Sequence, residues 1–118
     1  MNVRLERLDR ATVVIPEGRL DFDAAADFQK QLEGLFSSAT PTPPGAVIID
    51  CGSLEYVSSA GLRVFLLGAR AAQKAGVAFA VCSLKPAVRE VFDLSGFSRV
   101  LAVHPDRATA LGQGRGRA

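Results

Sequence analysis

Two adjacent hydroxyl side chains, Ser58 and Ser59, are the part of this 118-residue chain best placed to do chemistry. They follow an apolar run at residues 47–49 and a short connecting segment, and they precede apolar residues at helical spacing. The first N–H groups of a helix have no partner inside the helix, and a serine can accept from one of them. If Ser58 caps the helix, the Ser59 hydroxyl stands one residue further in and faces solvent.

Several readings of this serine pair compete. The plainest is a helix cap and nothing more, which the spacing alone favours. A nearby glycine, Gly61, has no side chain and would let another molecule approach the backbone closely. A hydrolase is the weakest option, because no Gly-x-Ser-x-Gly elbow surrounds Ser59 and His104 is the only histidine available for a triad. We therefore expect no catalytic residue and no enzyme.

Cofactors and metals are not expected either. The chain has no Gly-x-x-x-x-Gly-Lys-Ser/Thr loop and no Gly-x-Gly-x-x-Gly motif. Asp21, Asp23 and Asp50 could suggest magnesium, but acidic residues at such places more often cap helices or end strands. With one histidine and no ligand spacing around it, a metal site is not predicted.

Composition indicates one globular domain in the cytoplasm. Hydrophobic residues make up 48% of the chain and the net charge of +2 is scattered, which argues against nucleic-acid binding. We expect no signal peptide, no membrane span and two reduced cysteines at strand ends, Cys51 and Cys82. The domain is placed at residues 1–111, followed by a flexible Gly/Arg tail at 112–118, and the oligomeric state is left open.

Strands and helices are predicted to alternate along the chain. Asp23 is the expected cap of the first helix, Pro-rich residues 37–45 form a loop, and Asp106 caps a last helix at 107–111. Two strands at residues 5–8 and 12–16 form a hairpin. The expected fold is an α/β domain with a mixed sheet, begun by that hairpin and packed by about four helices. Further strands are predicted at residues 46–49, 77–81 and 100–103, and further helices at 58–76 and starting at 83–86.

Four segments in order carry a resemblance to a known family. The run Tyr-Val-Ser-Ser-Ala-Gly-Leu-Arg-Val-Phe-Leu at 56–66 resembles the signature of the STAS domain family. Gly-Arg-Leu-Asp at 18–21 is similar to the family's turn after its second strand, and Val-Ile-Ile-Asp at 47–50 to its central strand. Residues 83–96 match its third helix and the turn that follows. The resemblance implies a single STAS-like domain over most of the chain.

The resemblance also implies a function. The family signature Asp-Ser-Ser/Thr-Gly-Leu carries phosphate on the serine two residues before the glycine. In this chain that serine is Ser59, with Ser58 as second choice. The chain departs from the signature at two positions, because Ser58 stands where the family has its acid and Ala60 where it has its second hydroxyl. A stand-alone anti-sigma factor antagonist binds an anti-sigma factor that is also a serine kinase, is released on phosphorylation, and is reset by a serine phosphatase. The residues expected to bind the partner are Asp21, Asp23, Asp50, Ser58, Ser59, Ala60, Gly61, Leu62 and Arg63.

Two alternatives stay open beside this one. One is a STAS subunit of a transport or sensory complex, and the other is a module that senses a small ligand or nucleotide.

Phosphate at a helix start is locally favourable because of the free N–H groups and the helix dipole, so we expect the fold to tolerate it. If Asp21, Asp50 and Glu55 line the same edge, they would repel the phosphate.

Overall fold

The computed structural model describes residues 1–36 and 45–115. Over these residues the chain forms six strands, four α-helices and one short 3-10 helix. In chain order the elements are β1 (Asn2–Arg7), β2 (Ala11–Leu20), α1 (Phe22–Leu35), β3 (Ala46–Asp50), β4 (Leu54–Val57), α2 (Ser59–Ala75), β5 (Ala78–Cys82), α3 (Pro86–Leu94), η1 (Phe97–Arg99), β6 (Ala102–His104) and α4 (Arg107–Arg115).

The sheet is mixed, with strand order β1-β2-β3-β5-β6. Strand β1 pairs antiparallel with β2, while β2, β3, β5 and β6 run parallel to one another. The predicted hairpin and the predicted α/β class with a mixed sheet and four helices are therefore confirmed.

Strand β2 pairs with β1 along one edge and with two strands in succession along the other. Its first residues, from Ala11 to Val14, pair with β3, and its last residues, from Gly18 to Leu20, pair with β4. The register shifts between Gly18 and Arg19, where Gly18 adopts a left-handed φ of 100° that suits glycine. As a result the far end of β2, together with β4, projects beyond the point where β3 ends.

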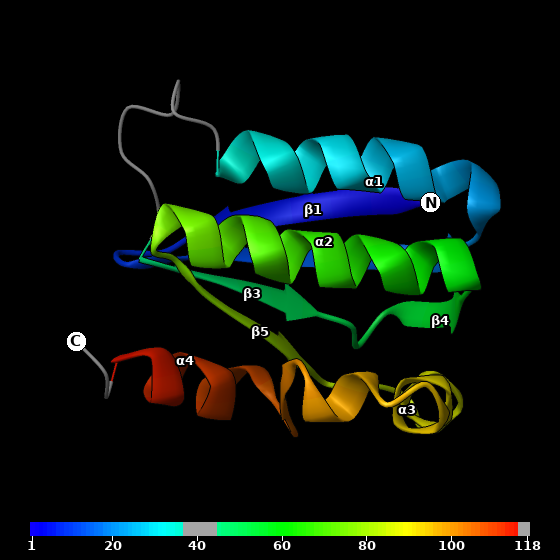
Figure 1. The fold of residues 1–118 in the computed structure, drawn as a ribbon. Helices are drawn as coiled ribbons and strands as arrows, with labels where there is room; N and C mark the ends of the chain where they lie inside the picture. The colour runs from blue at the N-terminus through cyan, green and yellow to red at the C-terminus, as the bar shows by residue number, and fades with distance from the viewer. Residues whose placement is uncertain (37–44, 116–118) are drawn as a thin grey trace.

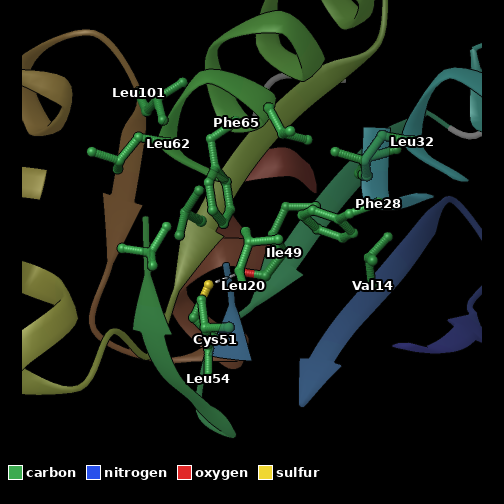
Figure 2. Packing of buried hydrophobic residues seen from close by; sticks show 14 of the residues in the cluster. Val14, Leu20, Phe28, Leu32, Ile49, Cys51, Leu54, Leu62, Phe65 and Leu101 are labelled. Atoms are coloured by element: carbon green, nitrogen blue, oxygen red, sulfur yellow. Dashed lines mark hydrogen bonds between the residues drawn. The ribbon is translucent and has the colours of Figure 1, made fainter. Parts of the chain in front are cut away.

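The helices cover the two faces of the sheet unequally (Figure 1). Helices α1 and α2 lie side by side on one face, and α4 lies on the other. The larger core is under α1 and α2. There the rings of Phe28 and Phe65 pack edge to face with their centroids 5.9 Å apart, and both point toward Ile49 (Figure 2). A smaller cluster, formed by residues such as Ile48 and Ala110, lies under α4.

Several element boundaries differ from those predicted. The cap of α1 is Asp21 and not Asp23, because the Asp21 carboxylate accepts from the Ala24 N–H at 3.0 Å. Strand β2 continues four residues past its predicted end at Pro16 because its later part pairs with β4. The connecting segment before Ser58 was expected to be a loop, whereas its residues 54–57 form β4.

The C-terminal end is also longer than predicted. Asp106 does cap α4, accepting from the Thr109 N–H at 2.7 Å, but the helix runs to Arg115 instead of ending at Leu111. The predicted tail at 112–118 is therefore partly helical. Its residues 116–118, like residues 37–44 of the predicted loop, lie outside the described residues.

Candidate functional site

The start of α2 is fixed by a serine cap. The Ser58 hydroxyl accepts from the Gly61 N–H at 3.1 Å, and the Ser58 carbonyl accepts from the Leu62 N–H at 2.9 Å. Ser58 is half-buried and extended, as a capping residue should be. The prediction that Ser58 caps and Ser59 stands one position further in is confirmed.

Ser59 is the first helical residue of α2, and it is exposed. The N–H groups of Ser59 and Ala60 precede the first intrahelical bond, which Leu62 donates. No acidic residue lies in the first turn of α2. The Ser59 hydroxyl is thus open to another macromolecule, and the helix end beneath it favours negative charge.

Leu20 supports this helix start from below. Its carbonyl accepts from the Ser58 N–H at 2.9 Å, and its side chain is fully buried. A Cβ placed on Gly61 would lie 2.7 Å from the Leu20 Cγ and 2.9 Å from the Leu20 oxygen. The close approach expected at Gly61 is therefore made by Leu20 of the same chain, and Gly61 is buried rather than open to a partner.

Leu62 and Ala60 also turn inward. Leu62 is buried in the larger core, beside Phe65 (Figure 2), and Ala60 packs partly against the same core. Arg63, by contrast, is exposed. Among the predicted partner-binding residues of α2, only the side chains of Ser59 and Arg63 are well exposed.

Helix α1 begins at the same end of the molecule as α2 (Figure 1), because Ser58 is bonded to Leu20, just before the start of α1. Asp21 is half-buried as the cap, and Asp23 is exposed in the first turn. Between them Phe22 is 79% exposed. The two predicted acids are thus brought to the end of the molecule that carries Ser59.

Sequence reasoning missed Phe22. Its spacing from Ala25 and Phe28 is that of the buried face of α1, so periodicity gives no sign that its ring is exposed. Phe22 instead occupies the first position of the helix, at the end of the molecule where no element covers most of its ring. An exposed aromatic residue of this size is a feature typical of binding surfaces.

A groove of about 330 Å³ is lined by the first turns of α1 and by the start of the chain. Its lining includes three carboxylates, Asp21, Asp23 and Asp27, together with Met1 and Val3 from the start of the chain. Among the described residues that line it, none has a basic side chain. This side of the candidate site is therefore acidic.

Strand β4 supplies the opposite side. The Arg19 guanidinium lies over the Tyr56 ring, 4.2 Å from its centroid, and Tyr56 is exposed. Glu55 and Lys85 form an exposed ion pair at 3.9 Å. Glu55 is therefore partly neutralised and adds little to any repulsion of a phosphate on Ser59.

Asp50 faces away from this assembly. Along β3 the side chains alternate, so Asp50 points to the same face as Ile48, toward α4, and Ile49 to the face of α1 and α2. The Asp50 carboxylate accepts from Arg107 of α4 at 3.0 Å and from the Gly52 N–H at 3.0 Å, and Arg107 also pairs with Glu6. The structure thus assigns Asp50 an internal ion-pair role and does not bring its carboxylate together with Ser59.

The two thiols are not competing nucleophiles. Both are free and buried at strand ends, as predicted. Burial raises the pKa of the Cys51 thiol well above its usual range, and burial likewise raises the pKa of Cys82 to about 11. Thiolate is the reactive form, so neither sulfur is activated near neutral pH.

Within residues 1–36 and 45–115 no three potential ligands gather as a metal site, and no helix is both long and apolar enough to span a bilayer.

The chain belongs to the STAS domain family, whose sequence model matches residues 2–110. It is 34% identical over 110 residues to BtrV, a proposed anti-sigma factor antagonist of Bordetella bronchiseptica, covering 93% of this chain and 91% of BtrV. Its fold is similar to that of the anti-sigma factor antagonist SpoIIAA in its unphosphorylated form, with a TM-score of 0.80 and 21% identity over 98% of this chain and 97% of SpoIIAA. The phosphorylated form of SpoIIAA, a Bacillus cell fate determinant, matches with a TM-score of 0.72 and 18% identity over 95% and 98% of the two chains.

Proposed function

We propose that this chain is an anti-sigma factor antagonist that works by partner switching and is controlled by phosphorylation of Ser59. Unmodified, it binds an anti-sigma factor that is also a serine kinase, and so frees a sigma factor. Phosphorylation of Ser59 ends the complex, and a serine phosphatase restores the hydroxyl. The chain is thus a kinase substrate and a binding module in the cytoplasm, where the kinase has ATP, and not itself an enzyme.

The observation that carries the proposal is the exposed Ser59 hydroxyl on a helix start that is fixed from two sides. The Ser58 cap and the Leu20 carbonyl hold the backbone, and the Ser59 side chain takes part in neither bond. Membership of the STAS family and the 34% identity to BtrV support the same role. SpoIIAA, which shares the fold, has been solved with and without phosphate.

The chemistry of the switch is a phosphoryl transfer. A bond forms between the Ser59 oxygen and the γ-phosphorus of ATP, the bond to the β-phosphate oxygen breaks, ADP leaves, and the hydroxyl proton passes to a base of the kinase. Ser58 is the less suitable acceptor, because its hydroxyl already accepts from the Gly61 N–H and is half-buried.

The phosphate acts on the interface more than on the fold. It adds about 1.5 to 2 negative charges, which the start of α2 accommodates through its dipole and its free N–H groups. A partner surface shaped for a neutral hydroxyl must instead desolvate a dianion. An unfavourable term of ~3 kcal/mol already weakens binding more than a hundredfold.

The first test locates the phosphate. The full chain is incubated with ATP and the cognate kinase anti-sigma factor, and the modified residue is identified by mass spectrometry. We expect phosphate on Ser59, none in Ser59→Ala, and normal modification in Ser58→Asn, which keeps a capping side chain. Phosphate on another residue would contradict the proposal.

The second test measures binding by calorimetry. Ser59→Ala should bind the anti-sigma factor as tightly as the unmodified chain, while Ser59→Asp should bind at least tenfold more weakly. Ser53→Asp, at an exposed residue between β3 and β4, is the control for added charge alone. Equal affinity of Ser59→Ala and Ser59→Asp would rule out control through this hydroxyl.

A further inference from the structure

Arg63 is a cation with no acidic neighbour on its own helix. It is exposed in α2, whose 17 residues include no Asp or Glu. Four other basic residues, Arg4, Lys85, Arg89 and Arg107, form ion pairs with carboxylates. Within the described part of the chain no such pair is found for Arg63. Its guanidinium is therefore available to an anion that arrives later.

The position of Arg63 relative to Ser59 is that of a helical ion pair. Residues four apart lie on the same side of a helix, with Cβ atoms about 5–6 Å apart. The favourable order places the acidic group on the N-terminal side and the basic group four residues later. A phosphate on Ser59 would be that acidic group, and both side chains are exposed and free to meet.

Arginine suits phosphate better than other cations do. Its planar guanidinium can donate two parallel hydrogen bonds to phosphate oxygens. The nearby Arg19 is already engaged with the Tyr56 ring. Arg70, the next arginine along α2, lies seven residues beyond Arg63 and is too far along the helix to reach the same group.

We propose that a phosphate on Ser59 is held by Arg63 of the same helix. One modification then adds a dianion to the surface that binds the partner and also neutralises a cation on that surface. The proposal rests on the proposed function in taking Ser59 as the phosphoacceptor. In the unmodified chain Arg63 faces the partner as a free positive charge. After phosphorylation the same guanidinium is occupied, and a carboxylate of the partner that it met loses its counter-charge.

The test measures the phosphate directly and needs no kinase. Phosphoserine is introduced at position 59 of the full chain during translation, and the second ionisation of the phosphate is followed by phosphorus NMR. An adjacent guanidinium favours the dianion, so the phosphate pKa should be about 0.5 unit lower with Arg63 present than in Arg63→Gln. Arg63→Lys should retain part of the effect, and 0.5 M salt should reduce it.

Arg70→Gln is the matched control, because it removes an exposed arginine from the same helix. It should leave the phosphate pKa unchanged, and circular dichroism should show all variants folded. Equal phosphate pKa values in the parent, Arg63→Gln and Arg70→Gln would overturn the proposal and assign the phosphate to the helix N-terminus alone. Failure of the kinase to modify Ser59 would instead count against the proposed function, and this titration would still stand.

Discussion

Helices α1 and α2 begin at the same end of the molecule with the same backbone device. In each, a polar cap accepts from the third helical N–H: Asp21 from Ala24 at 3.0 Å, and Ser58 from Gly61 at 3.1 Å. In each, the first helical residue is exposed. One of these residues is an aromatic ring and the other a hydroxyl, so a common local structure presents one permanent apolar contact and one group whose charge can change.

The surroundings of the two starts differ in charge. The first turn of α1 is acidic through its cap and Asp23, and it borders a groove lined by carboxylates. The first turn of α2 has no acid, and Arg63 lies one turn further on. Of the two helix starts, that of α2 is the better suited to a phosphate, which supports the proposal that the switch lies on the second helix.

The largest effect is expected from filling the space under α2. At the third helical position α1 has Ala24, whereas α2 has Gly61 pressed against Leu20. Gly61→Val should lower the free energy of unfolding by about 3 kcal/mol or more, measured by urea denaturation, because the Leu20 backbone cannot retreat. Gly34→Ala in α1 is the control: a Cβ there meets nothing within 4 Å and should stabilise by about 0.5–1 kcal/mol. A stable Gly61→Val chain would contradict the packing described for α2.

The next effect concerns the apolar contact of α1. Phe22→Ala should weaken binding to the proposed anti-sigma factor partner by about 1–3 kcal/mol. We expect its large exposed ring, at the end of the molecule that carries Ser59, to become buried in the complex. Its melting temperature should hardly change, since Phe22 is 79% exposed. Val100→Ala, at a residue 65% exposed before β6 and so at the opposite end of the parallel strands, should leave binding unchanged. If Phe22→Ala binds like the parent chain, the surface that binds the partner does not include α1.

The two caps should have similar, smaller effects. Ser58→Ala and Asp21→Ala should each cost about 1 kcal/mol of stability in urea denaturation, because each leaves one helical N–H without its acceptor. Ser58→Asp should retain the cap and lose almost nothing. A loss of stability in Ser58→Asp equal to that of Ser58→Ala would show that the Ser58 hydroxyl does something other than cap.

The smallest effect is expected at Ser59 itself. Ser59→Ala should change the free energy of unfolding by less than about 0.5 kcal/mol, because its hydroxyl is exposed and outside the cap. A substantial loss would mean that the hydroxyl is structural. The contrast with Ser58→Ala, one residue away, separates the capping serine from the one available for modification.

The sequence predicted the elements whose signals are local. Apolar runs located β3 and β5, helical spacing located α1 and α2, and the serine pair placed the α2 cap correctly. Strand β4 was missed because its two middle residues, Glu55 and Tyr56, are exposed and only its ends are buried. Its pairing with the far end of β2 is a long-range contact that periodicity does not contain.

The site residues that sequence reasoning misjudged share a cause. Gly61 was expected to open the surface and Asp50 to join the site, and in both cases the deciding contact comes from another part of the chain. Leu20 fills the space at Gly61, and Arg107 pairs with Asp50 on the face of the sheet that α4 covers. Spacing locates a helix start, but it does not show which contacts the residues near that start will make with distant parts of the chain.

The double hold of Leu20 on α2 has a consequence for the speed of recognition. One residue supplies a carbonyl to the Ser58 N–H and a side chain beneath Gly61, while its strand is hydrogen-bonded to β4. If the two helix starts bind the proposed partner, their backbone is already held in place, and we expect little conformational entropy to be lost on association. Encounter should then be limited by diffusion and charge, and changes at this surface should show mainly in how long the complex lasts.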